Sequence, residues 1–159
     1  MDELKTLIGI RNTRLEDAER RVYSAMAQLT EAQMDLQKKE TRLEEYVLEL
    51  PKLVDDIYLT IMGKKADVKT VEEAVMKEKK LYVVKDDYTL QVKQAVNVVG
   101  EKEKAVLEAQ QHRQKEEIRR DGLVDVKKDY DKELKIEVER RQSKQLDDLA
   151  TIQFTRKHN

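Results

Sequence analysis

The sequence has no cysteine, no tryptophan, one phenylalanine and one proline among its 159 residues. Without cysteine, the chain has no disulfide framework, no thiolate metal site and no cysteine nucleophile. Aromatic residues make up only 4% of the chain and charged residues 41%, so there is too little large apolar material for a thick globular core. The same composition suits long helices, because each of them buries only one stripe.

An excess of one charge is also absent. The chain carries 32 basic and 33 acidic side chains, interleaved along its length, which gives a formal net charge of −1. This balance offers no field that would attract a phosphate backbone, so we expect no nucleic-acid partner. The acidic start lacks the basic and apolar regions of a signal peptide, and no apolar run approaches the roughly 20 residues that span a bilayer. We therefore expect a soluble, intracellular protein that does not insert into membranes.

Apolar residues instead recur at alternating steps of three and four over the first part of the chain. This spacing keeps one apolar seam on a helix and is the sequence rule for a coiled coil. Two basic residues interrupt the series. Its members are Leu4, Ile8, Arg11, Leu15, Ala18, Val22, Ala25, Leu29, Ala32, Leu36, Lys39, Leu43, Tyr46 and Leu50.

A second, weaker series follows later in the chain. It carries a charged residue at three positions and consists of Val71, Ala74, Glu78, Leu81, Lys85, Tyr88, Val92, Ala95, Val99, Lys102, Val106 and Ala109. Residues 110–121 are polar on every face apart from Ile118, and the count resumes after Gly122. The second series therefore predicts a second long helix with a more polar seam.

Helix boundaries follow from the few residues that break or cap helices. Pro51 removes one helical hydrogen bond, yet the first series stays in phase beyond it, so we predict a helix over about residues 2–62 that is kinked at Pro51. Gly63 suits a helix stop. Thr70 and Glu73 have the spacing of a capping box, which predicts a turn over residues 63–69 and a second helix over about 70–151.

Two long helices joined by one short turn predict an all-α fold, a long antiparallel two-helix coiled-coil hairpin. We expect a single domain over residues 1–159 and a monomer, because the two seams satisfy each other within one chain. About 25 residues of the second helix would then extend beyond the start of the first. The rival arrangement is one bent rod that dimerises in parallel, and the stop and start signals at Gly63 and Thr70 argue against it.

No residue pattern indicates catalysis. Gly63-Lys64 lacks the spacing of a phosphate-binding loop. Glu108, His112 and Glu116 share one helix face, but without a further ligand type nearby the favoured interpretation is a solvated face. A pair of helices also offers no pocket in which the pKa of an acid or base would shift. We predict no catalytic, cofactor-binding or metal site.

Apolar residues that point away from the seam gather beside the predicted turn. Outward apolar residues at one end of a helical pair suggest a docking surface. In the alternative, Pro51 breaks the helix and residues 52–62 fold back as a local cap, and the sequence leaves both interpretations open. Several lysines around the turn would complement an acidic partner, or they are ordinary solubilising lysines, and the sequence does not decide between the two. The predicted partner-binding residues are Leu48, Tyr58, Leu59, Met62, Met76, Tyr82, Val83 and Leu90.

Parts of the chain resemble a known family. The early stretch Arg14–Arg21, rich in Arg, Glu and Ala, and the mid-chain stretch Glu45–Tyr58 with Gly63 and Val68 are similar to the YscO/FliJ family of type III secretion and flagellar export proteins. The likeness is to the virulence-type, YscO-like members in particular, and it spans essentially the whole chain. The basic tail Arg156–His158 departs from the more acidic end expected of the family.

The resemblance implies an antiparallel two-helix coil similar to the rotor stalk of rotary ATPases. It implies a cytoplasmic bacterial protein, peripheral to the secretion apparatus, that acts as the central stalk of the hexameric secretion ATPase. It also implies contact with the membrane export gate and with secretion chaperones, and no active site in the chain itself. On this basis we expect the turn end to dock on the gate and the end with both termini to enter the ATPase.

A second reading of the residues does not use the resemblance. In that reading the chain is a structural coiled-coil tether or scaffold, dimeric and without an ATPase link. Stimulation of a secretion ATPase would favour the stalk, whereas parallel dimerisation would favour the tether.

Overall fold

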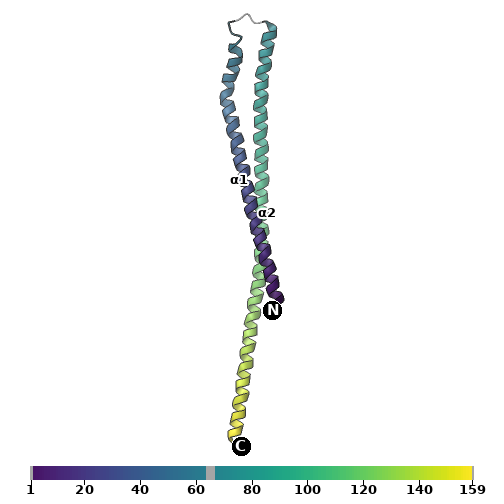
Figure 1. Cartoon of the computed structure of the whole chain (residues 1–159), viewed down its shortest axis with the longest axis vertical. Coiled ribbons are helices and arrows are strands. Elements are labelled where there is room, and N and C mark those ends of the chain that lie inside the picture. The colour runs from purple at the N-terminus through teal and green to yellow at the C-terminus, as the bar shows by residue number, and fades with distance from the viewer. Residues whose placement is uncertain (1, 64–66, 159) are drawn as a thin grey trace. The chain divides into compact units, whose positions relative to one another are not determined.

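In the computed structural model, the described residues 2–63 and 67–158 form two α-helices and no strand. Helix α1 spans Asp2–Leu59 and helix α2 spans Val68–His158. The two helices pack against each other along much of α1 (Figure 1). The predicted all-α fold of two long, paired helices is therefore confirmed.

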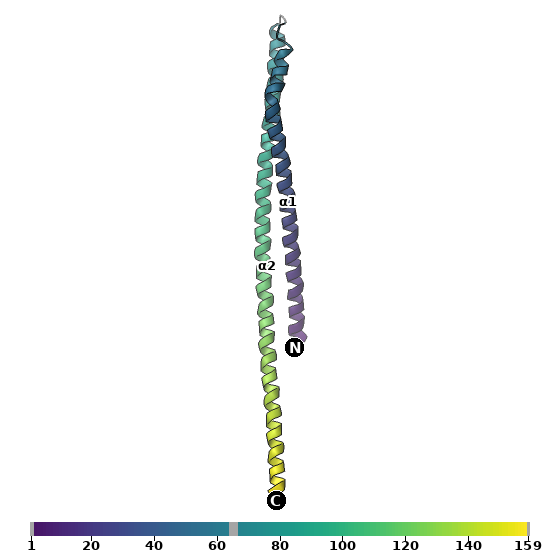
Figure 2. The same ribbon diagram turned by 90° about the vertical axis from the view of Figure 1, so that its left-hand side faces the viewer.

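The contacts divide the chain into two units, each with a stretch of α1 beside a stretch of α2. One unit combines the start of α1, through Glu19, with α2 from Gln111 onward. The other is Arg20–Gln110 and holds the rest of both helices. In each unit the two helices run antiparallel, as both views show (Figures 1 and 2). That the units form one hairpin domain over residues 1–159 stays a prediction.

The apolar series of the sequence lie on the inner sides of the helices. Every member of the first series, from Leu4 to Leu50, is buried or half-buried. In the second series, from Val71 to Ala109, Val71 is the one exposed member. The most buried apolar residues are Leu15, Ala18, Val22, Leu50, Ala74 and Ala95. Half of these are alanines, which let two helix backbones approach closely.

Helix α1 continues through Pro51. Leu53 and Ile57 beyond it are half-buried and keep the phase of the seam. The alternative in which Pro51 breaks the helix and residues 52–62 fold back as a cap is therefore wrong. A packed seam on both sides of the proline offsets its missing hydrogen bond.

The end of α1 lies three residues before the predicted end. The helix ends at Leu59, and the N–H groups of Ile61 and Met62 both donate to the carbonyl of Tyr58 at 3.0 Å. Gly63 follows with φ of 83°, in the left-handed region that glycine adopts without a steric penalty. Gly63 therefore does not end the helix directly, as the sequence predicted, but closes the hydrogen-bonded turn that follows it.

Helix α2 begins earlier than predicted, because Asp67 and not Thr70 caps it. An Asp67 carboxylate oxygen accepts from the Thr70 backbone N–H at 2.9 Å and from the Thr70 hydroxyl at 2.5 Å. This is the bond between the capping residue and the third helical residue of a standard N-cap. The donors lower the pKa of Asp67, the Thr70 hydroxyl most strongly. Residues 64–66 of the predicted turn lie outside the described residues.

The C-terminal part of α2 runs on alone. It extends to His158 rather than to about residue 151, and its basic last turn suits the negative end of a helix dipole. The rings of Phe154 and His158 stack at 4.2 Å between centroids. From residue 132 to 158 every residue is exposed, and the start of α1 that belongs to the same unit does not lie beside them (Figures 1 and 2).

Candidate partner-binding surface

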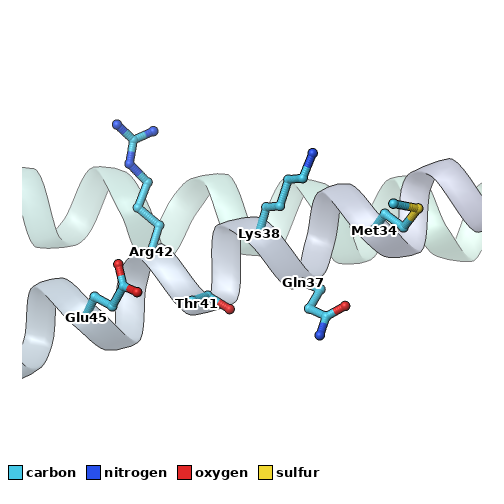
Figure 3. A pocket seen from close by; sticks show the side chains of 6 residues that line it. All are labelled: Met34, Gln37, Lys38, Thr41, Arg42 and Glu45. Atoms are coloured by element: carbon cyan, nitrogen blue, oxygen red, sulfur yellow. The ribbon is translucent and has the colours of Figure 1, made fainter.

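A shallow hollow lies along α1, and all of its lining side chains come from that one helix (Figure 3). They are Met34, Gln37, Lys38, Thr41, Arg42 and Glu45. The hollow is the space between neighbouring turns of α1 and is not enclosed by both helices. No group of three or more His, Asp or Glu residues suited to a metal ion occurs in the described part of the chain.

Seven of the eight residues predicted to bind a partner are exposed, and they lie near the end of α1, just after it, and in the first part of α2. Leu48 is the most exposed, at 80%. On α2, Met76, Val83 and Leu90 recur at steps of seven and form one outward stripe. We call this set the turn-end patch; it comprises Leu48, Leu59, Met62, Met76, Tyr82, Val83 and Leu90.

Tyr58 is the exception, and the outward position predicted for it is wrong. Its side chain is half-buried, and its hydroxyl donates to Glu78 Oε2 on α2. This hydrogen bond, followed by burial and the charge of Glu78, raises the pKa of Tyr58. Glu78 is a member of the second seam, so Tyr58 satisfies a polar group there and holds the two helices together behind the patch.

A groove with a basic excess adjoins the patch at the start of α2. Three lysines and two glutamates surround the Met76 side chain, and the lining residues are Lys69, Glu72, Glu73, Met76, Lys77 and Lys80. An exposed methionine adapts to apolar partners of different shapes.

A polar and aromatic cluster fixes the two helices next to the patch. The Tyr46 hydroxyl donates to the Leu81 carbonyl oxygen at 2.7 Å, and the rings of Tyr46 and Tyr88 meet edge to face at 5.2 Å. The Arg42 guanidinium carbon lies 4.9 Å from the centre of the Tyr88 ring. Burial, with a smaller effect of Tyr88, raises the pKa of Tyr46. These contacts hold α1 and α2 together beside the turn-end patch.

In the other unit, a charged pair lies inside the seam. Glu116 is only 4% exposed, and its Oε2 lies 3.6 Å from Arg11 Nη1. Neither of these two buried atoms has a hydrogen-bond partner, whereas Glu116 Oε1 accepts from Arg119 at 3.1 Å. The favoured interpretation of a solvated face at Glu116 was wrong.

A sequence signal for this pair does exist. Continued in steps of four and three from Ala109, the count passes through Arg113, Glu116, Arg120 and Leu123. Three of these four positions are buried or half-buried, so the seam crosses the polar stretch in phase. Arg11, the first charged member of the first series, is the matching signal on α1.

Comparisons with known proteins assign the chain to a family. No helix among the described residues has the length and apolar character that a membrane crossing requires. No curated protein and no solved structure gave a significant match. The sequence profile of the family described as type III secretion protein YscO matches residues 4–151, nearly the whole chain. The chain therefore belongs to the YscO family of type III secretion proteins.

Proposed function

We propose that this type III secretion protein is the central stalk of the hexameric secretion ATPase and couples it to the export gate and to chaperone handling. The observation that carries the proposal is the antiparallel packing of α1 and α2 within each unit, along a narrow seam rich in alanine. A stalk inside a hexameric ring has to be a slender, self-sufficient helical pair. The YscO family membership supports the same role.

In this proposal the chain carries no catalysis of its own, and ATP hydrolysis belongs to the ATPase. The hollow along α1 and the groove on α2 are each lined by a single helix, which suits contact with protein surfaces. The tether alternative needs the seam free for a second chain. The seam residues of α1 and α2 cover each other within this chain, which favours the stalk.

The two tasks fall on different surfaces. The turn-end patch offers exposed apolar side chains and a basic groove, which suit the export gate. The unit with the start of α1 and the end of α2 is the one we propose for the ATPase ring, on the analogy with rotary stalks. The protein would work in the bacterial cytoplasm, peripheral to the secretion apparatus.

The test is the hydrolysis rate of the purified cognate secretion ATPase with and without the full chain. We expect the chain to raise the rate of ATP hydrolysis in a saturable manner. A central stalk favours assembly of the ring and the passage of its subunits, one after another, through the catalytic states. An unchanged rate under conditions where the hexamer forms would contradict the stalk role. A heat-unfolded sample of the chain is the matched control.

A further inference from the structure

The C-terminal segment of α2, residues 132–158, exposes an apolar face that no other described residue of its unit covers. Leu134, Val138, Leu149 and Ile152 are all between 44% and 56% exposed. At 100° per residue these four fall within about one sixth of the helix circumference. They continue the phase of Leu123, which lies in the paired part of the seam. The face is thus a seam that has lost its partner helix.

The residues along this face have a nearly symmetric order of types, with opposite charges at the two ends. Read towards the C-terminus, they are an acid, two apolar residues, two glutamines, two apolar residues and a base: Asp131, Leu134, Val138, Gln142, Gln145, Leu149, Ile152 and Arg156. Residue types therefore match when the segment is laid antiparallel on a copy of itself. In an antiparallel helix pair, a seam residue near the start of one segment meets a seam residue near the end of the other. This order of residue types is therefore self-complementary.

We propose that, in the free chain, this segment binds the same segment of a second copy as an antiparallel, two-fold symmetric helix pair. The predicted monomer is then the form that enters the ATPase ring of the proposed function, because the same end of the chain cannot be paired and inserted at once. In the pair, Leu134 meets Ile152 of the other copy, Val138 meets Leu149, and Gln142 meets Gln145. By symmetry each contact occurs twice, which yields four apolar layers around a central polar pair of layers. A polar layer at the centre fixes the register, as buried amides do in coiled coils.

Charge complementarity selects this orientation. Asp131 lies at the height of Arg156 of the other copy, so each end of the pair is closed by an ion pair. On one flank, Arg141 lies near the height of Asp148 of the other copy. Within the chain, Asp131 lies 3.7 Å from Lys127 and Arg141 lies 3.1 Å from Glu137. In the dimer, Asp131 and Arg141 would therefore each have one partner in their own chain and one in the other copy. Parallel pairing would instead set equal residues, and hence equal charges, side by side.

The first measurement is the weight-average mass by sedimentation equilibrium over a range of concentrations of the full chain. We expect it to rise from the 18.7 kDa of one chain towards twice that value, because four half-exposed apolar layers give a reversible rather than a permanent dimer. A mass that stays at one chain at every concentration would overturn the proposal and leave the face to a different protein.

Orientation is tested by cysteine cross-linking, since the natural chain has no cysteine. Gln142→Cys and Gln145→Cys variants are prepared separately, mixed and oxidised. Antiparallel pairing predicts that the mixed disulfide exceeds either disulfide between identical chains. A preference for disulfides between identical chains would mean parallel pairing and would overturn the proposal.

A matched pair of substitutions tests the face. Leu149→Asp places a carboxylate in two apolar layers, and we expect it to weaken the dimer at least about tenfold. Ile136→Asp is the control, because Ile136 is exposed to the same degree, 57% against 56%, but lies on the opposite face of the helix. Equal loss of the dimer in both variants would contradict the assignment of the face.

Discussion

At the scale of single residues, a charge inside the seam between α1 and α2 can be matched by an opposite charge on the other helix. Arg11 and Glu116 show this at the end of the pair that holds the start of α1. Their facing atoms are 3.6 Å apart and lack hydrogen bonds, so the attraction between them has to offset the loss of water from both. Such a pair adds less stability than specificity, because it fixes which turn of α1 meets which turn of α2.

Removal of one member of this pair should be costly, and removal of both should not. We expect Glu116→Ala to lower the free energy of unfolding by about 1–3 kcal/mol, since Arg11 then keeps a buried donor without its counter-charge. The double variant Arg11→Leu with Glu116→Leu should be at least as stable as the natural chain, because it completes the apolar seam. Urea unfolding followed by far-ultraviolet circular dichroism measures both.

The double variant also serves as the control for helix propensity, because alanine and leucine are both good helix formers. A loss of stability in Glu116→Ala that is absent from the double variant therefore does not come from helix propensity. If Glu116→Ala leaves the free energy of unfolding unchanged, the pair contributes nothing to the seam. The register would then be set by the apolar residues alone.

At the scale of elements, the hydrophobic period predicts both helices and most of the face that each of them buries. The steps of three and four identify every buried position of α1, because a helix with one partner has only one face to bury. The seam across residues 110–121 could not be found by hydrophobicity, since charged residues fill it and only a partner at Arg11 reveals their role. The phase of the count was the remaining signal.

Element ends were less predictable than element faces. Thr70 with Glu73 matches the capping pattern, yet Asp67 lies three residues earlier and is a stronger acceptor, so it starts α2. The candidate surface shows the same limit. Seven outward positions follow from the period, but Tyr58 has a hydroxyl that finds Glu78 on the other helix, which a period cannot predict.

The cap at Asp67 predicts a pH dependence of the stability of α2. The pKa of Asp67 is lowered from its ordinary value of 3.8, so the charged form stabilises the folded chain. This contribution is fully present above the ordinary value and is lost as the pH falls through the lowered pKa. The natural chain should therefore have a higher unfolding midpoint than Asp67→Ala at neutral pH, and the gap should close in acid.

Thermal unfolding of both chains at matched pH values measures this gap, because all other carboxylates are common to the two. Thr70→Val is the companion variant, since it removes the hydroxyl donor and leaves the backbone N–H. In that variant the pKa of Asp67, followed by nuclear magnetic resonance, should move back towards its ordinary value. A gap between the natural chain and Asp67→Ala that is the same at all pH values would mean that the carboxylate charge does not cap α2.

At the scale of the whole molecule, the proposed stalk role requires two surfaces that work independently. The turn-end patch belongs to the unit Arg20–Gln110, whereas the surface proposed for the ATPase belongs to the unit with the C-terminal part of α2. A substitution in the patch should therefore affect one partner and spare the other. Because the patch residues are exposed, such a substitution should also leave the helices paired.

Val83→Asp tests this separation. It places a carboxylate in the middle of the stripe that also contains Met76 and Leu90, and we expect it to weaken binding to the cytoplasmic part of the export gate by at least about tenfold. Stimulation of ATP hydrolysis should be unchanged.

Leu107→Asp is the control, since Leu107 is similarly exposed on the same helix, 54% against 64% for Val83, but lies outside the patch. Equal weakening of gate binding by both variants would remove the patch as the docking surface, because a general loss of apolar surface would then explain the effect. Loss of ATPase stimulation by Val83→Asp alone would mean instead that the patch faces the ring, and the assignment of the two surfaces would have to be exchanged.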